Sequence, residues 1–340
     1  MSIIVDKQVS YQADTVHITV VDLIPEDIYR LELRLFHEKG SHASYGVYKA
    51  FSDGTIDLKD SKPIRGTYHD IDPMGLFTSI QPYELRHGDF VHFYDQFHYE
   101  LCLKNMNGTV VDSIVLQKLW MDRNLERIEV EEEIVGTILK PKGDGPFPCI
   151  LDISGTGGSL YEQRGAMLAR EGYVVLCLAY MGYKNLPKNL AEVDLEYFEA
   201  AIQYLTKLPY TTDQLDLHGI SFGGTICLYL ATKCSAIKAV CVVNEQHSMT
   251  TPNLAMLENG KPRKCVEMDY NSCYKVNQKV VICSKAVKAT TQFLDDSTDL
   301  EWHKIPKDTA IRYVAGMDDL TIPAIHAINY IRKMIGRKIE

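Results

Sequence analysis

The segment from Leu215 to Tyr229, LDLHGISFGGTICLY, constrains the fold more than any other part of the chain. In it, a short apolar run gives way at a glycine-flanked serine to a helical pattern. Because Gly219 and Gly223 carry no side chains, a strand and the helix after it can pass closely here. The pattern predicts a sharp strand-to-helix turn that projects the Ser221 hydroxyl from a sheet. Such a short motif also arises by chance, so the surrounding sequence decides its meaning.

Length and composition are those of a globular protein with a large core. The chain has 340 residues, 46% hydrophobic and 24% charged, which favours two domains. A formal net charge of -9 argues against broad electrostatic binding to nucleic acid or to an anionic membrane. No apolar run is long enough for a membrane span, and MSIIVDKQVS is not typical of a signal peptide. The cysteines include no CxxC pair, so we expect free thiols, a cytoplasmic location and no metal site.

The pattern of apolar residues changes about a third of the way along the chain. Short alternating runs such as VHITVVDL and YELCLK, broken by Gly, Asp and Asn, predict a β-sandwich over residues 1–125. Over residues 126–340, apolar strands alternate with helical segments, including DLEYFEAAIQYLTK and a predicted helix near Leu160–Glu171. This alternation predicts a mostly parallel sheet with helices on both faces and catalytic residues at the carboxyl ends of its strands. We expect the polar segment 245–300 to form an excursion over the active site.

A candidate acid follows the late predicted strand Ala310–Ala315, in the turn Gly316-Met317-Asp318-Asp319. In this fold class, an acid after a late strand orients the catalytic histidine, and the order of serine before acid agrees. We favour Asp319 over Asp318 for that role. Both residues equally fit a turn or a cap of the helix predicted near Thr321, because Asp is common at such positions.

A glycine-rich loop, Ser154-Gly155-Thr156-Gly157-Gly158, follows the predicted strand CILDI. One oxyanion-hole N–H in this fold class comes from the residue after the nucleophile, here Phe222. The other comes from such a loop, and we assign it to Gly157. A purely structural turn is the alternative. Neither GxGxxG nor GxxxxGK(S/T) is present, so the loop does not predict a phosphate-bearing cofactor.

These segments, taken in order, resemble the type I acyl-CoA thioesterases and bile acid-CoA:amino acid N-acyltransferases. The resemblance covers nearly the whole chain and rests on RGTYHDIDPMGLFTSIQP, GPFPCILDISGTGG, YVVLCLAYMGYKNLP, DLEYFEAAIQYL, GISFGG and GMDD. It implies an N-terminal β-sandwich joined to an α/β-hydrolase domain, with Ser221 as nucleophile and Asp319 as triad acid. Within the family, the conjugating transferases carry Cys as nucleophile and the thioesterases carry Ser. Ser221 therefore favours hydrolysis of a fatty acyl-CoA.

The chain departs from the family pattern in three places. The family's histidine lies beyond the acid in a GHxxxPP-like loop, whereas this sequence ends at Glu340 after a predicted amphipathic helix, IPAIHAINYIRKMIGRKIE. We therefore expect the last strand and the histidine loop to be missing. Phe222 stands where many thioesterases have Lys, although only its backbone N–H is needed for an oxyanion hole. Asn244-Glu245-Gln246-His247 replaces a small polar stretch, which bears on the acyl-binding pocket.

Four histidines are considered as substitutes for the triad base. His326 lies in the predicted C-terminal helix, and His218 lies on the strand before the elbow, where a packing role is favoured. His247 follows the next strand at the carboxyl end of the sheet but precedes the acid. His303 is near the acid in sequence only. None is assigned as catalytic, because a base must reach Ser221 within hydrogen-bond distance.

Three functional hypotheses remain open. The first is a cytoplasmic thioesterase that hydrolyses fatty acyl-CoA through Ser221 in fatty acid metabolism. The second is a family member impaired by the missing histidine, which binds acyl-CoA or a partner. The third is transfer of the acyl group to an amino acid.

Overall fold

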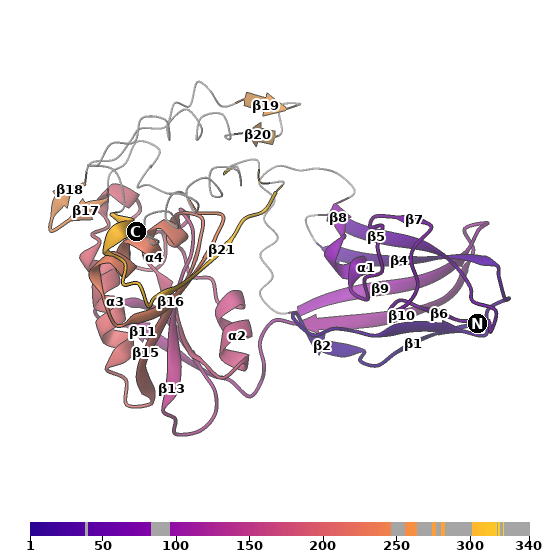
Figure 1. Ribbon diagram of the computed structural model, residues 1–340, viewed down its shortest axis with the longest axis horizontal. Helices are drawn as coiled ribbons and strands as arrows, with labels where there is room; N and C mark the ends of the chain where they lie inside the picture. The colour runs from indigo at the N-terminus through magenta and orange to yellow at the C-terminus, as the bar shows by residue number, and fades with distance from the viewer. Residues whose placement is uncertain are drawn as a thin grey trace. The chain divides into compact units, whose positions relative to one another are not determined.

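The computed structural model describes residues 1–37, 40–82, 96–245, 256–263, 274–276, 280–282, 301–317, 319 and 322. The chain divides into two compact units, Met1–Asp122 and Arg123–Glu340 (Figure 1). No helix in the described ranges is long and apolar enough to cross a membrane.

The first unit is built from two sheets with apolar side chains between them. Strand β4 shows why, because its sequence IYRLELRLFH alternates: Leu31 and Leu33 are buried in the core, whereas Arg30 and Arg34 point to the other face. The described part of the smaller sheet has the order β1-β3-β6, and that of the larger sheet β2-β10-β9-β4-β5-β7, with β8 paired to β5. The elements of this unit are β1 (Ser2–Val5), β2 (Val9–Tyr11), β3 (Ile18–Val21), β4 (Ile28–His37), β5 (Gly40–Lys49), β6 (Ile56–Asp57), β7 (Arg65–Gly66), α1 (Gly75–Thr78), β8 (Gln81–Pro82), β9 (Gln96–Asn105) and β10 (Val110–Leu119).

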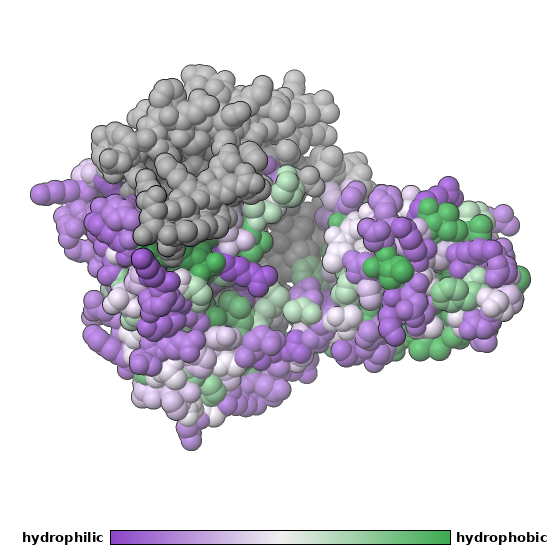
Figure 2. Space-filling view, in the orientation of Figure 1, coloured by the Kyte–Doolittle hydropathy of each residue, from purple (hydrophilic) through white to green (hydrophobic). Residues whose placement is uncertain are grey.

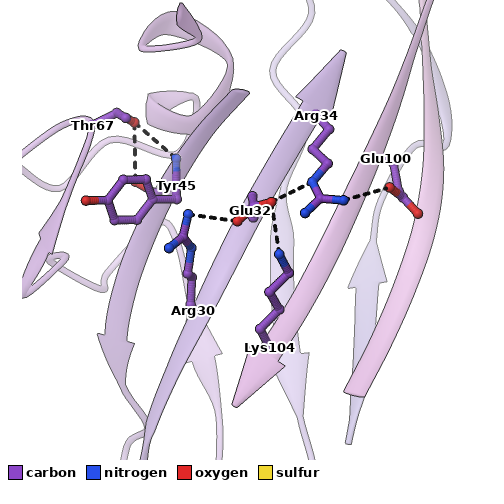
Figure 3. A network of polar contacts seen from close by, with 7 residues as sticks. All are labelled: Arg30, Glu32, Arg34, Tyr45, Thr67, Glu100 and Lys104. Atoms are coloured by element: carbon purple, nitrogen blue, oxygen red, sulfur yellow. Dashed lines mark hydrogen bonds and ion pairs between the residues drawn. The ribbon is translucent and has the colours of Figure 1, made fainter. Parts of the chain in front are cut away.

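A buried carboxylate organises the outer face of the larger sheet (Figure 3). The Glu32 side chain is only 5% exposed and accepts from Arg30 Nη2 at 2.8 Å, Arg34 Nε at 2.5 Å and Lys104 Nζ at 3.0 Å. Burial alone would raise the pKa of Glu32, but hydrogen bonds and charges from these cations lower it below its ordinary value. Arg30 also lies 4.0 Å from the centre of the Tyr45 ring. The network thus joins β4 to β9 and β5 on the face opposite the core.

The second unit contains the mostly parallel sheet that the sequence predicts. Its described strands follow the order β11-β12-β14-β13-β15-β16-β21; pairs from β14 onward are parallel, and those at the β11 end are antiparallel. Helix α2 lies on one face of the sheet, and α3 and α4 lie on the other (Figure 1). The elements that frame the site are β11 (Glu126–Glu131), β12 (Val135–Lys140), β13 (Phe147–Ile153), α2 (Gln163–Arg170), β14 (Val174–Ala179), α3 (Glu196–Thr206), β15 (Thr211–Ile220), α4 (Phe222–Lys233), β16 (Ile237–Val243) and β21 (Ala310–Val314).

Helix α4 is apolar around its whole circumference because it is enclosed. Its residues from Phe222 to Ala231 are all buried, and the core around it includes Leu215 and Leu217 of β15 and Val240 of β16. An all-round apolar helix is typical of such a buried position. The predicted helices near Leu160 and in DLEYFEAAIQYLTK correspond to α2 and α3.

The polar segment after residue 245 is described only in part. It contains η3 (Trp302–Lys304) and the short strands β17 (Leu257–Glu258), β18 (Lys261–Pro262), β19 (Tyr274–Val276) and β20 (Val280–Ile282). Strand β17 pairs with β18, and β19 pairs with β20. The predicted excursion over the active site, and the predicted C-terminal helix, fall largely outside the described residues.

The surface is mixed in character. The face drawn in Figure 2 is mostly hydrophilic, with hydrophobic residues scattered over both units. Exposed apolar side chains of the first unit include Ile4, Val9 and Val115.

Candidate active site

Ser221 occupies the turn between β15 and α4 in a backbone conformation that side chains rarely adopt. Its φ is 54° and its ψ is -126°, a region that costs strain for a residue other than glycine. The surrounding backbone holds it there: its N–H donates to the Val243 carbonyl at 2.8 Å, and its own carbonyl accepts from the Gly224 N–H at 2.9 Å. The turn predicted from the sequence is therefore present.

The flanking glycines are required by close backbone approach. A Cβ added at Gly219 would lie 2.5 Å from the Gly223 carbonyl oxygen. A Cβ at Gly223 would collide with the carbonyl oxygens of Ile153 and Ser154. The first turn of α4 thus lies directly against the end of β13, and this brings the loop after β13 beside Ser221.

Within that loop, Gly155 is the residue that lies against the serine. A Cβ added at Gly155 would be 3.2 Å from Ser221 Cβ and 3.7 Å from Ser221 Oγ, whereas one at Gly157 would meet the Tyr161 hydroxyl at 3.4 Å. The Ser154 hydroxyl donates to the Ser159 carbonyl across the loop at 3.2 Å. The assignment of an oxyanion donor to Gly157 stays a prediction.

Phe222 is the first residue of α4, and its side chain is buried, with 2% exposure. The first N–H groups of an α-helix have no acceptor within the helix, and the helix dipole favours negative charge at that end. The Phe222 N–H therefore fits the role of oxyanion donor predicted for it, and this role also stays a prediction.

Asp319 lies beyond β21 and is partly exposed. Its N–H donates to the Gly316 carbonyl at 3.2 Å, and its Oδ1 accepts from the Ile322 N–H at 3.0 Å. These contacts are those of a turn and cap residue, one of the two roles that the sequence left open. Asp318 lies outside the described residues. The role of Asp319 as triad acid stays a prediction.

Asn244 joins the serine turn to the turn that precedes Asp319. Its N–H donates to the Val314 carbonyl at 2.8 Å, and its Oδ1 accepts from the Gly316 N–H at 2.6 Å. Its φ of 47° lies in the left-handed region, which Asn tolerates better than most residues. Since Val243, the preceding residue, accepts from the Ser221 N–H, both turns are anchored on the end of β16.

Next to Asn244, the Glu245 carboxyl group is enclosed. The residue is 1% exposed, and its Cβ lies where a side chain on Gly224 of α4 would have to fit. Burial raises the pKa of Glu245 to about 8, and the Tyr313 and Thr225 hydroxyls offset only part of that effect. The enclosed site therefore favours the uncharged, protonated form of the Glu245 carboxyl group.

His218, the histidine closest to Ser221 in sequence, is engaged inside the sheet. Its Nδ1 lies 2.7 Å from Oδ1 of Asp152, a residue only 1% exposed, and Arg164 Nη2 lies 3.2 Å from Asp152 Oδ2. His218 precedes Ser221 by three strand residues, which corresponds to about 10 Å along the strand. The arrangement agrees with the packing role favoured from the sequence.

The other histidines do not complete a triad within the described structure. His303 lies in η3 and is exposed. His247 and His326 fall outside the described residues. The described part of the chain thus contains the serine, its turn and an acidic residue after β21.

Both parts of the chain match one family. Residues 13–132 match the acyl-CoA thioester hydrolase/BAAT N-terminal region, and residues 193–338 match the BAAT / acyl-CoA thioester hydrolase C-terminal region.

Curated relatives agree with this. Bile acid-CoA:amino acid N-acyltransferase of Mus musculus is 33% identical over 68% of this chain and 58% of that protein. Acyl-coenzyme A thioesterase 3 of Mus musculus is 31% identical over 89% of this chain and 71% of that protein. Acyl-coenzyme A thioesterase 1 of Rattus norvegicus is 33% identical over 67% of this chain and 56% of that protein. The chain thus spans less than two thirds of the first and third of these relatives.

The two family matches and the identity to these relatives agree with the α/β-hydrolase sheet and the N-terminal sheet unit. The chain therefore belongs to the acyl-CoA thioester hydrolase and bile acid-CoA:amino acid N-acyltransferase family.

Proposed function

We propose that this protein hydrolyses fatty acyl-CoA to a fatty acid and coenzyme A, with Ser221 as nucleophile. The observation that carries the proposal is the strained turn at Ser221, whose φ of 54° aims the side chain at Gly155 between a buried strand and a helix N-terminus. Strain of this kind persists only where the surrounding structure enforces it, and it is concentrated at functional sites. The acyl-CoA thioesterases among the relatives support the substrate class.

The proposed chemistry has two stages. Ser221 Oγ attacks the thioester carbonyl carbon while its proton passes to a base. The negative oxygen of the tetrahedral intermediate is stabilised by the Phe222 N–H and by an N–H of the loop 154–158. The C–S bond then breaks, coenzyme A leaves and takes up the proton, and an ester forms on Ser221. Water attacks this acyl-enzyme with help from the same base and releases the fatty acid.

The base is the open part of the mechanism. Asp319, at the carboxyl end of β21, is proposed to orient it, as the acid does in serine hydrolases of this topology. His218 is excluded by its distance along the strand and by its bond to Asp152. Separate His247→Ala and His326→Ala variants test the two histidines that remain after Ser221 in sequence, apart from the exposed His303.

A cytosolic role in fatty acid metabolism is part of the proposal. The described cysteines Cys102, Cys149, Cys177, Cys227, Cys234 and Cys241 are free thiols, which supports a reducing compartment.

A second candidate is transfer of the acyl group to an amino acid. It is favoured by the 33% identity to the mouse N-acyltransferase. In that case the acyl-Ser221 ester would be attacked by an amine in place of water. The two reactions share the nucleophile and differ in the acceptor.

The test is thiol release from palmitoyl-CoA by the full chain, with Ser221→Ala as control and with glycine and taurine added in parallel. We expect the wild type to release free thiol and fatty acid, and Ser221→Ala to lose on the order of 10⁴ in kcat. Accumulation of N-acyl product in place of fatty acid would favour the transferase. Equal rates for wild type and Ser221→Ala would reject both enzymatic roles. Palmitoyl-CoA binding to such a protein, measured by calorimetry, would then identify an acyl-CoA binder.

A further inference from the structure

Tyr180, the residue that follows β14, reaches the backbone of the loop that lies beside Ser221. It is fully buried, and its ring packs edge-on against Phe198 with ring centroids 5.1 Å apart. Its hydroxyl donates a hydrogen bond to the Gly155 carbonyl oxygen and lies 3.3 Å from the Ser154 carbonyl oxygen. A buried tyrosine hydroxyl needs such a partner, and here the partner belongs to the loop and not to the body of the sheet.

The backbone of the same residue holds the other end of the loop. The Tyr180 N–H donates to the Gly158 carbonyl at 2.7 Å, and the Met181 N–H donates to the same oxygen at 3.1 Å. The Gly158 N–H in turn donates to the Gly155 carbonyl at 2.9 Å. Tyr180 therefore hydrogen-bonds both ends of the turn from Gly155 to Gly158, through its hydroxyl at Gly155 and its N–H at Gly158.

These bonds fix the orientation of one peptide group. The Gly155 carbonyl oxygen is held by two donors, the Tyr180 hydroxyl and the Gly158 N–H. Because a trans peptide is planar, the Thr156 N–H must point away from that carbonyl. Gly155 lies against Ser221, and the next residue, Thr156, is exposed.

We propose that Tyr180 is a positioning residue that fixes the Gly155–Thr156 peptide so that the Thr156 N–H, together with the Phe222 N–H, receives the oxyanion. The proposal rests on the proposed function of Ser221 as nucleophile. It places the second donor at Thr156 and not at Gly157, whose own position faces Tyr161.

The physical advantage is preorganisation. Donors that are already oriented need no rearrangement when charge develops on the substrate oxygen, which is why loss of one such donor costs kcat on the order of 10²-fold. Burial raises the pKa of Tyr180 well above its ordinary value, so the hydroxyl remains a donor at any working pH.

Tyr180→Phe keeps the ring and its packing and removes only the hydroxyl. Tyr197→Phe is the control for loss of a buried hydroxyl, because the Tyr197 ring also packs on Phe198 and its hydroxyl contacts backbone groups outside the loop 154–158: it donates to the Ala179 carbonyl at 2.7 Å and accepts from the Val135 N–H at 2.9 Å. Thr156→Pro removes the proposed donor itself at an exposed position.

The first readout separates transition-state from ground-state binding. For Tyr180→Phe we expect kcat with palmitoyl-CoA, and affinity for an acyl trifluoromethyl ketone, each to fall on the order of 10²-fold. KM, and affinity for a non-hydrolysable acyl-CoA thioether, should stay within about threefold. Thr156→Pro should show the same split, and Tyr197→Phe should match the wild type in all four quantities. Tyr180→Phe behaviour equal to that of Tyr197→Phe, or a parallel loss of thioether binding, would overturn the proposal.

The second readout does not depend on acyl-CoA turnover. A fluorophosphonate forms a bond from Ser221 Oγ to phosphorus and releases fluoride, while the phosphoryl oxygen takes the oxyanion position. We expect the labelling rate to fall in Tyr180→Phe and Thr156→Pro and to persist in Tyr197→Phe. Labelling of the wild type without thioester hydrolysis would reject the proposed substrate and keep the role of Tyr180. Equal labelling of all variants, or no labelling of the wild type, would reject that role.

Discussion

The Gly316 N–H donates to Asn244 Oδ1 at 2.6 Å, and this bond joins the end of β16 to the turn that precedes Asp319. Asn244 follows Val243, whose carbonyl accepts from the Ser221 N–H at 2.8 Å. Two turns that are 95 positions apart in sequence, at Ser221 and Gly316, are thus held on consecutive residues of one strand end. If Ser221 is the nucleophile, as proposed, this bond predicts that a substitution at Asn244 lowers turnover.

Asn244→Ala should lower both stability and turnover. It removes the bond to Gly316 and places a side chain with little tolerance for left-handed backbone at a φ of 47°. We expect a loss of about 1–3 kcal/mol in the free energy of unfolding, measured by urea denaturation, and a lower kcat. Asn244→Gly keeps the backbone freedom and loses only the bond, so it should recover part of the stability and little of the kcat. If Asn244→Gly regains full kcat, the bond does not position the acid.

Glu245→Gln should change how stability depends on pH. The carboxyl has an ordinary pKa of 4.5 and a folded pKa of about 8. Between these values the unfolded chain releases a proton that the folded chain retains, so the free energy of unfolding of the wild type falls as pH rises. Each pKa unit corresponds to about 1.4 kcal/mol. Glutamine does not titrate, so the advantage of the variant should grow from pH 4.5 to about 8. Urea denaturation at the two ends of this range measures it, and an advantage independent of pH would contradict the assignment.

Asp152→Ala should strongly destabilise the second unit. The substitution leaves the Arg164 guanidinium and the His218 ring without the buried carboxylate that they share. Loss of one partner from a buried pair costs about 3–5 kcal/mol. Asp216→Asn is the control, because Asp216 lies on β15 two residues before His218, and burial raises its pKa. Its substitution should be neutral or stabilising in the same thermal or urea unfolding measurement. Similar losses in the free energy of unfolding for the two variants would show that the network around Asp152 contributes no more to stability than Asp216 does.

Glu32→Ala should destabilise the first unit for a related reason. Arg30, Arg34 and Lys104 converge on this carboxylate, and without it their charges repel one another on the sheet. We expect a loss of about 3–5 kcal/mol by urea denaturation. Glu100 is 3.8 Å from Arg34 and more exposed, so Glu100→Ala should cost about 0–1 kcal/mol. If Glu100→Ala is the more damaging change, the network is not centred on Glu32.

Local patterns predicted the elements, and contacts between distant segments decided the details of the site. The glycines around Ser221 predict the turn because the strand and helix that they allow to pass closely are adjacent in sequence. The loop 154–158 contains three glycines in one short run, and which of them meets the serine depends on the path of the turn. The structure places Gly155 against Ser221, and the composition of the loop alone does not distinguish Gly155 from the other two glycines.

Tyr180 and Asn244 had no distinct signal in the sequence. Tyr180 is the last residue of YVVLCLAY, and in the sequence it looks like an ordinary core aromatic. Only the pairing of β14 with β13 brings it to the loop after β13. In the sequence, Asn244 is only part of a departure from the family pattern, because its bond to Gly316 depends on the register between β16 and β21. The same register places Tyr313 beside the end of β16, where the enclosed Glu245 carboxyl lies.

The pair of Asp152 and His218 has a consequence for how triads are recognised. The Asp152 carboxylate lies 2.7 Å from the imidazole of His218, which precedes the proposed nucleophile Ser221 by three residues. A search based on residue types and distance alone would accept this pair. The strand geometry excludes the pair as a triad, because three residues of strand separate His218 from Ser221 by roughly 10 Å. The imidazole is therefore too far from the Ser221 hydroxyl to accept its proton. Asp152 and His218 thus resemble the acid and base of a catalytic triad in residue type and distance, but their contacts are those of a structural network within the sheet.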